Sequence, residues 1–143
     1  MATTRSAHTV WKGDLFTGSG QTSLDTSGLG TYDVTWDARA EKAEGKTSPE
    51  ELLAAAHATC YSMQFSNMLK ENGTTAESIK TSAAVDFVPG TGITEIRLTV
   101  DATVPGISNE DFQRLATGAK DTCPVSGALA SVPSITIEAT LAS

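Results

Sequence analysis

The sequence has 143 residues, enough for one hydrophobic core but too few for two ordinary domains, so we expect a single domain over residues 1–143. Hydrophobic residues make up 39% of the chain and charged residues 19%, which is typical of a globular protein and is neither disordered nor membrane-like. The net charge of -7 argues against a nucleic-acid partner, because phosphates are neutralised by clustered lysine and arginine.

The amino terminus gives no indication of secretion. Residues 1–16 lack the apolar core of a signal peptide, and no later stretch reaches the roughly 20 apolar residues of a membrane span. We therefore expect a cytoplasmic protein with no membrane partner. In a reducing compartment the two cysteines, Cys60 and Cys123, are not expected to form a structural disulfide, and any pairing between them would be transient and chemical.

The first third of the chain is typical of short strands separated by glycine turns. Tyr32, Val34 and Trp36 alternate with polar residues, which predicts a half-buried strand that runs through Trp36. A long helix is then predicted over 49–72. Ser48 is a suitable N-cap, Pro49 suits the first helical position, and a glutamate at position 51 completes a capping box.

This helix is small or apolar almost all the way round. Ala54, Ala55, Ala58 and Ser62 widen an apolar face that already includes Cys60. Such a helix is expected to be buried on most sides, and its small residues would let another helix or a sheet approach closely.

The remaining chain predicts a hairpin, two further helices and a last strand. Alternating residues over 79–87 and 96–104 flank a Pro-Gly-Thr-Gly turn and indicate a long antiparallel hairpin. Ser108 caps the next helix, a short helix is predicted from Cys123 to near Pro133, and a strand over 135–141 follows. The helix after Ser108 is expected to bury Phe112, Leu115, Ala116 and Ala119. Strands and helices are partly segregated, so the fold class is α+β with antiparallel pairing.

Cysteine is the first candidate for chemistry. Cys60 lies in the middle of the long helix among apolar residues, where a buried, inert thiol is the ordinary interpretation. Cys123 weakens that interpretation, because it precedes Pro124 at a predicted helix start, where N–H groups and the helix dipole stabilise a thiolate. Together the two thiols form a plausible attacking and resolving pair, which only the fold could bring together.

Histidine offers weaker alternatives. His57 lies three residues before Cys60, so a Cys-His nucleophile pair is possible in principle. We favour a hydrogen-bonded core or interface histidine, because no carboxylate at helical spacing orients the ring. A metal site of His8, His57, Cys60 and Cys123 is conceivable, but their spacing matches no compact ligand pattern, so we expect neither metal nor cofactor.

Two motifs resemble a known family. The stretch that contains Cys60 reads SPEELLAAAHATCYSM, and the stretch that contains Cys123 reads KDTCPVSGAL. Both resemble motifs of the OsmC/Ohr family of osmotically inducible and organic hydroperoxide resistance proteins. The histidine before the first cysteine and the arginine of WDARAE are more similar to the OsmC branch than to the Ohr branch.

This resemblance implies a fold, a reaction and a set of site residues. The family's antiparallel sheets wrap around long central helices in an intertwined homodimer with active sites at the subunit interface. Its members are thiol peroxidases, in which Cys60 would be the peroxidatic and Cys123 the resolving cysteine. Arg39 would match the active-site arginine and Glu50 the carboxylate that holds it. Implied partners are an organic hydroperoxide and a dithiol reductant of the lipoyl type.

Helix geometry adds a hypothesis of its own. Glu50 and Cys60 are ten residues apart, which on a straight helix is ~15 Å along the axis and ~80° around it. A carboxylate at that distance would not serve the thiolate of its own chain, so Glu50, with or without Arg39, is expected to act across a two-fold axis on the partner's Cys60. Two alternatives stay open: a stress-related small-molecule-binding dimer with passive cysteines, and a zinc-dependent protein.

Overall fold

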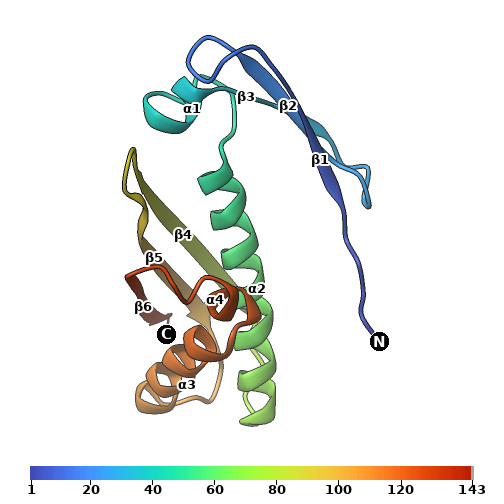
Figure 1. Cartoon of the computed structure of the whole chain (residues 1–143). Coiled ribbons are helices and arrows are strands. Elements are labelled where there is room, and N and C mark those ends of the chain that lie inside the picture. Colours follow the sequence, from blue (N-terminus) through green and yellow to red (C-terminus); the bar gives the residue numbers. More distant parts are fainter. Residues whose placement is uncertain (143) are drawn as a thin grey trace. The chain divides into compact units, whose positions relative to one another are not determined.

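The computed structural model describes residues 1–142, and its contacts divide the chain into two compact units, Met1–Leu52 and Leu53–Ser143. Strands β1–β3 and helix α1 belong to the first unit, and strands β4–β6 with helices α3 and α4 belong to the second (Figure 1). Helix α2, Pro49–Glu71, begins in the first unit and continues through the second. Within residues 1–142, no helix combines the length and the apolar character that a membrane crossing requires.

The first unit is built on a three-stranded antiparallel sheet in the order β1-β2-β3. Its strands are Ala7–Lys12, Ser19–Leu24 and Thr31–Val34. At Gly20, opposite Trp11 in the register, a Cβ would lie 2.7 Å from the indole ring, so this strand position requires a glycine. These strands confirm the prediction of short strands in the first third of the chain.

The prediction that the third strand runs through Trp36 is wrong. The strand ends at Val34, and Trp36 begins α1, Trp36–Ala40. The Thr35 hydroxyl caps this short helix, because its Oγ1 accepts a hydrogen bond from the Ala38 N–H at 3.1 Å. The prediction used side-chain alternation alone and overlooked Thr35 as a helix N-cap.

Helix α2 confirms the predicted long helix, with its end one residue earlier than expected. The Ser48 Oγ accepts a hydrogen bond from the Glu51 N–H at 3.2 Å, as an N-cap should. The second half of the predicted capping box differs, since the Glu51 carboxylate accepts a hydrogen bond from the Thr47 hydroxyl at 2.6 Å. Glu51 therefore stabilises the start of the helix as expected, but through a hydrogen bond with Thr47 and not with the Ser48 backbone.

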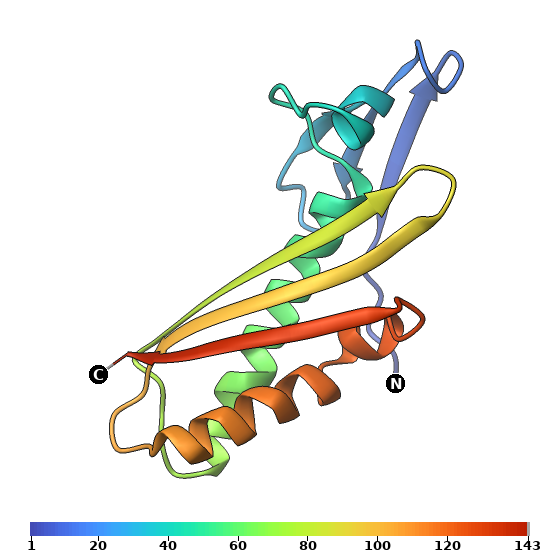
Figure 2. The ribbon, with the colours of Figure 1, turned by 90° about the vertical axis from the view of Figure 1, so that its left-hand side faces the viewer.

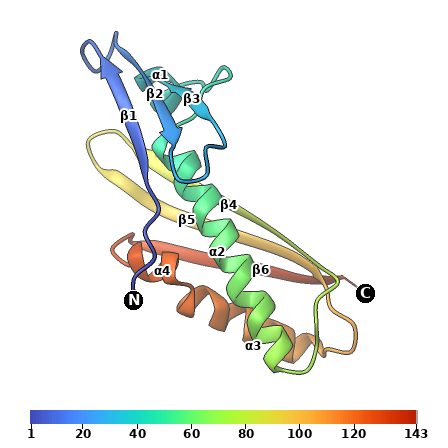
Figure 3. The same ribbon diagram turned by 90° about the vertical axis from the view of Figure 1, so that its right-hand side faces the viewer.

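The second unit is a three-stranded sheet with helices packed on one face (Figures 2 and 3). Its strands are β4, Ser78–Val88, β5, Gly92–Thr103, and β6, Ser134–Ala142, and its helices besides α2 are α3, Asn109–Thr122, and α4, Pro124–Ala128. Strands β4 and β5 form the predicted antiparallel hairpin. The predicted helix after Cys123 is shorter than expected.

Strand β6 corrects the expectation of antiparallel pairing throughout. It pairs with β5 in parallel, and Leu98 lies opposite Ile137 in the register. The reason is the connection: α3 and α4 carry the chain back along the sheet before β6 begins, and a helical crossover of this kind produces parallel strands. The α+β class itself is confirmed, with one mixed sheet.

The hydrophobic core of this unit lies between the sheet and helices α2 and α3. It contains the fully buried side chains Tyr61, Phe65, Leu69, Ile96, Val100 and Phe112. All four residues that we expected α3 to bury are buried. Within the single chain, α2 is not buried on most sides, because Thr59 is exposed and Met63 is 67% exposed on the face away from the core.

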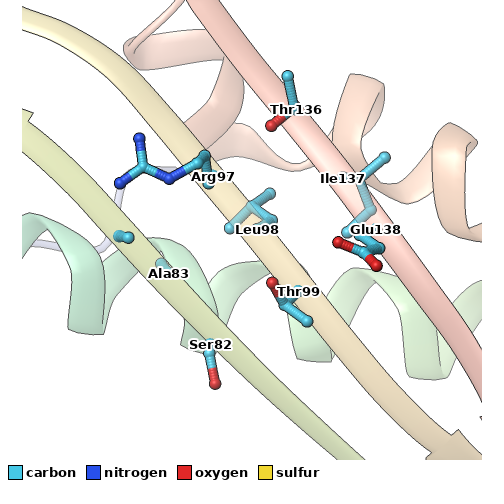
Figure 4. Close-up of a pocket in the computed structure, with 9 residues that line it drawn as sticks. Ser82, Ala83, Arg97, Leu98, Thr99, Thr136, Ile137 and Glu138 are labelled. Carbon is cyan, nitrogen blue, oxygen red and sulfur yellow. The ribbon is translucent and has the colours of Figure 1, made fainter.

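The other face of the sheet carries a shallow hollow (Figure 4). Exposed residues of three neighbouring strands, among them Ser82, Thr99 and Thr136, line it together with Arg97 and Glu138. The hollow arises because short side chains lie between two long charged ones. It contains neither cysteine, so it is not a candidate for thiol chemistry.

Candidate active site

The two cysteines meet in the second unit. Cys60 lies on α2, about halfway along the helix, and is partly exposed. Cys123 is 1% exposed and lies between two helices, as C-cap of α3 and N-cap of α4. Pro124 at the first position of α4 fixes this break in the chain. The fold thus brings together the two thiols that 63 positions separate in sequence (123 − 60).

The electrostatics of the pair are dominated by burial. Burial raises the pKa of the Cys60 thiol, and a hydrogen bond with Cys123 raises it further. The backbone N–H of Val125 donates to Cys60 and lowers this pKa in part. Val125 is the second residue of α4, so an N–H left unpaired at a helix start is directed at the Cys60 sulfur. Within this unit, therefore, the Cys60 thiol resists ionisation.

His57 is a buried, hydrogen-bonded histidine, as we favoured. It is 0% exposed, and its Nε2 lies 2.7 Å from the Oγ of Ser126 on α4. Burial lowers the pKa of its imidazole, so the ring is held neutral. Its Nδ1 has no hydrogen-bond partner among residues 1–142. The ring is therefore engaged with the serine hydroxyl of the helix that follows Cys123.

Arg39 and Glu50 form an ion pair in the first unit. Arg39 lies in the last turn of α1, and its Nε donates to the Glu50 Oε1 at 3.0 Å while its Nη2 donates to Oε2 at 2.9 Å. Glu50, at the start of α2, is 6% exposed, so this bidentate pair is largely withdrawn from water. The predicted pairing of these two side chains is confirmed, and their predicted catalytic roles stay predictions.

Sequence reasoning found five of the residues described here, Cys60, Cys123, Arg39, Glu50 and His57, and missed two contacts. Ser126 lies in the quoted motif, but a serine three residues after a cysteine does not indicate which helix it will face. The Val125 N–H was missed for a related reason, since we had considered the start of the short helix only as an aid to Cys123. Across the described part of the chain, no group of three or more His, Cys, Asp or Glu side chains is arranged to hold a metal ion.

Comparison with known proteins decides the family. The family model described as OsmC-like protein matches residues 40–138 of this chain. The chain belongs to this family. The matched segment includes α2, both cysteines and Glu50, and it begins directly after Arg39.

Individual relatives agree with this assignment. The chain is 41% identical to the protein named Peroxiredoxin OsmC of Escherichia coli (strain K12) over 122 residues, 83% of this chain and 85% of that protein. The OsmC-like fold is also seen in an OsmC-like protein from Mycoplasma pneumoniae, with a TM-score of 0.75, 17% identity and full coverage of both chains. The organic hydroperoxide resistance protein OhrB of Bacillus subtilis has a TM-score of 0.64 and 22% identity, over 96% of this chain and 98% of its own.

Proposed function

We propose that this OsmC-like protein is a cysteine-based hydroperoxide reductase that converts organic hydroperoxides to alcohols. The observation that carries the proposal is the contact between the Cys60 and Cys123 thiols, one partly exposed and the other buried. A peroxide can reach the sulfur of Cys60, and the sulfur of Cys123 lies next to it, shielded from solvent. The name Peroxiredoxin OsmC of the 41% identical relative supports a peroxide as the substrate.

The proposed reaction has two steps. The Cys60 thiolate attacks one oxygen of the peroxide; an S–O bond forms, the O–O bond breaks, and the alkoxide leaves and takes up a proton. Cys123 then attacks the sulfur of the sulfenic acid, the S–S bond forms, and the hydroxyl leaves as water with the Cys123 proton. A dithiol reductant restores both thiols by exchange with this disulfide.

Arg39 and Glu50 are proposed to assist the first step. Because burial raises the pKa of Cys60, its thiolate needs a nearby cation, and no cation is among the causes of its pKa shift within the described residues. The Arg39 guanidinium remains charged at any physiological pH, and Glu50 fixes its orientation through two hydrogen bonds. We propose that this pair acts at Cys60 across a homodimer, where it would also donate to the departing oxygen.

Mass spectrometry of the intact protein after one equivalent of cumene hydroperoxide tests the reaction. We expect the loss of two hydrogens and a disulfide-linked peptide pair that contains Cys60 and Cys123. In Cys123→Ser, the same treatment should leave Cys60 as a sulfenic acid that dimedone traps. Unchanged thiols in folded wild-type protein would rule the proposal out.

A small-molecule-binding protein with passive thiols is the second candidate. The raised pKa of Cys60 favours it, because a protonated thiol is a poor nucleophile. Site-resolved alkylation at pH 7 separates the two candidates. A Cys60 that reacts with iodoacetamide faster than free cysteine supports the reductase, and one that reacts much more slowly supports the binding protein.

A further inference from the structure

A hydrogen bond between two side chains joins α2 to the helix that follows Cys123. His57 Nε2 and Ser126 Oγ are 2.7 Å apart, and both residues are buried, at 0% and 7% exposure. His57 lies three residues before Cys60, and Ser126 lies three residues after Cys123. The bond therefore connects the two segments that carry the thiols, one helical turn away from each sulfur.

A second bond lies on the other side of the thiols. The side-chain amide of Gln64 donates to the Oγ1 of Thr122 at 2.8 Å, and Thr122 in turn donates to the carbonyl of Gly118 at 2.8 Å. Gln64 lies four residues after Cys60, and Thr122 directly precedes Cys123. The two bonds bracket the cysteine pair on both helices. The second is exposed to water and contributes less than the buried one.

Stability alone does not explain a histidine at position 57. Its Nδ1 is buried without a hydrogen-bond partner among the described residues, which is unfavourable for folding. An apolar side chain would fill the same place without an unpaired nitrogen. What only a polar side chain provides here is the bond to Ser126, the side-chain bond from α2 to α4 that accompanies the backbone bond from the Val125 N–H to Cys60.

We propose that His57 and Ser126, assisted by Gln64 and Thr122, hold Cys123 in the position from which it attacks oxidised Cys60. Disulfide formation is demanding in geometry, since the Cα atoms must lie within about 4.4–6.8 Å and the C–S–S–C dihedral near 90°. His57 is thus a positioning residue, which neither exchanges a proton with the peroxide nor touches it. The proposal rests on the proposed function, because it concerns the second step of that reaction, in which the S–S bond forms and water leaves.

Single-turnover measurements with cumene hydroperoxide test this role. The variants His57→Leu and Ser126→Ala remove the bond, and His57→Gln restores a hydrogen-bonding nitrogen near the place of Nε2. We expect Cys60 to be oxidised at the wild-type rate in all three. Disulfide closure should slow about tenfold in the first two and recover in His57→Gln, since a well-made hydrogen bond contributes about that factor.

Ser62→Ala is the matched control. The Ser62 hydroxyl lies two residues from Cys60 and bonds to the Thr81 hydroxyl of β4 at 2.7 Å, so its removal breaks a connection from α2 to the sheet and not to Cys123. Dimedone competition gives a second readout. It should trap more sulfenic acid in His57→Leu and Ser126→Ala than in wild type, and no more in Ser62→Ala.

The outcomes separate this inference from the proposed function. Wild-type protein that forms neither sulfenic acid nor disulfide would overturn the reductase and the positioning role together. Wild-type protein that closes its disulfide, with Ser126→Ala closing at the same rate and giving no extra dimedone adduct, would overturn the positioning role alone. Ser126→Ala removes a single oxygen atom, so the test does not depend on whether His57→Leu folds.

Discussion

Cys60 and Cys123 touch each other but have different access to solvent. Cys60 is partly exposed on α2, whereas Cys123 is 1% exposed between α3 and α4. In the reaction that we propose, a peroxide would therefore reach Cys60 before Cys123. Burial also raises the pKa of the Cys60 thiol, so the reaction that we propose requires a further group to stabilise its thiolate.

The pH dependence of Cys60 alkylation shows whether Arg39 is that group. In Arg39→Met the raised pKa of Cys60 is uncompensated, so the alkylation rate should still climb about tenfold per pH unit from pH 7 to 9. In wild type the rate should level off at lower pH. Iodoacetamide labelling, quantified on the Cys60 peptide, provides the measurement, and Arg97→Met controls for loss of one positive charge. Identical profiles in wild type and Arg39→Met would exclude Arg39 as the activating cation.

His57 should make stability depend on pH in a definite direction. Burial lowers its pKa below the ordinary value of 6.5, so below pH 6.5 the unfolded chain binds a proton that the folded chain does not. The stability that this contributes is complete above pH 6.5 and is lost as the pH falls further, towards the folded-state pKa. Urea unfolding at pH 7.5 and 5.5 should show a larger loss for wild type than for His57→Gln. An equal loss in both would contradict a neutral, buried imidazole.

At the residue scale the sequence identified the participants and, through the resemblance, one of their contacts. The motifs around Cys60 and Cys123 predicted both thiols, and the resemblance predicted the pairing of Arg39 with Glu50. The partner of His57 could not be predicted, because it depends on how a helix 69 residues away packs against α2. Local spacing carries no information on such a contact.

For helix α3, the sequence correctly predicted both the N-cap residue and the buried face. Ser108 Oγ accepts a hydrogen bond from the Asp111 N–H at 3.1 Å, and the apolar positions at helical spacing form the buried face. The end of the third strand was predicted wrongly, because Trp36 continues the alternation of β3 although Thr35 already caps a helix. Strand β6 alternates correctly, but alternation does not indicate whether its neighbour is parallel.

The Ser108 cap gives a quantitative prediction for α3. Ser108→Ala should lower the free energy of unfolding by about 1 kcal/mol, because it leaves an N–H of the first turn without its side-chain acceptor. Ser108→Asp retains a side-chain acceptor, so it should lower the free energy of unfolding by only a few tenths of a kcal/mol. Urea unfolding at pH 7 compares the three proteins. Equal losses in the two variants would mean that the serine contributes by packing and not as a cap.

At the scale of the molecule, the exposed face of α2 calls for an explanation. Thr59 is exposed and Met63 is 67% exposed, and they flank Cys60 on a helix with many small residues. A second copy of the chain would cover such a surface, in keeping with our expectation of a homodimer. An antiparallel pair of α2 helices would also bring Glu50 of one subunit towards Cys60 of the other.

Mixed dimers test this arrangement directly. A dimer of one Cys60→Ser subunit and one Glu50→Ala subunit contains a single intact Cys60 and a single intact Glu50, on different chains. If Glu50 acts across the two-fold axis, one of the two sites is complete, and the mixed dimer should keep about half of the wild-type peroxidase activity. Each parent homodimer should be inactive or nearly so. Co-expression with two different affinity tags isolates the mixed species, and sedimentation confirms its size. Activity no higher than that of the parents, in a dimer of verified composition, would place Glu50 beside the cysteine of its own chain.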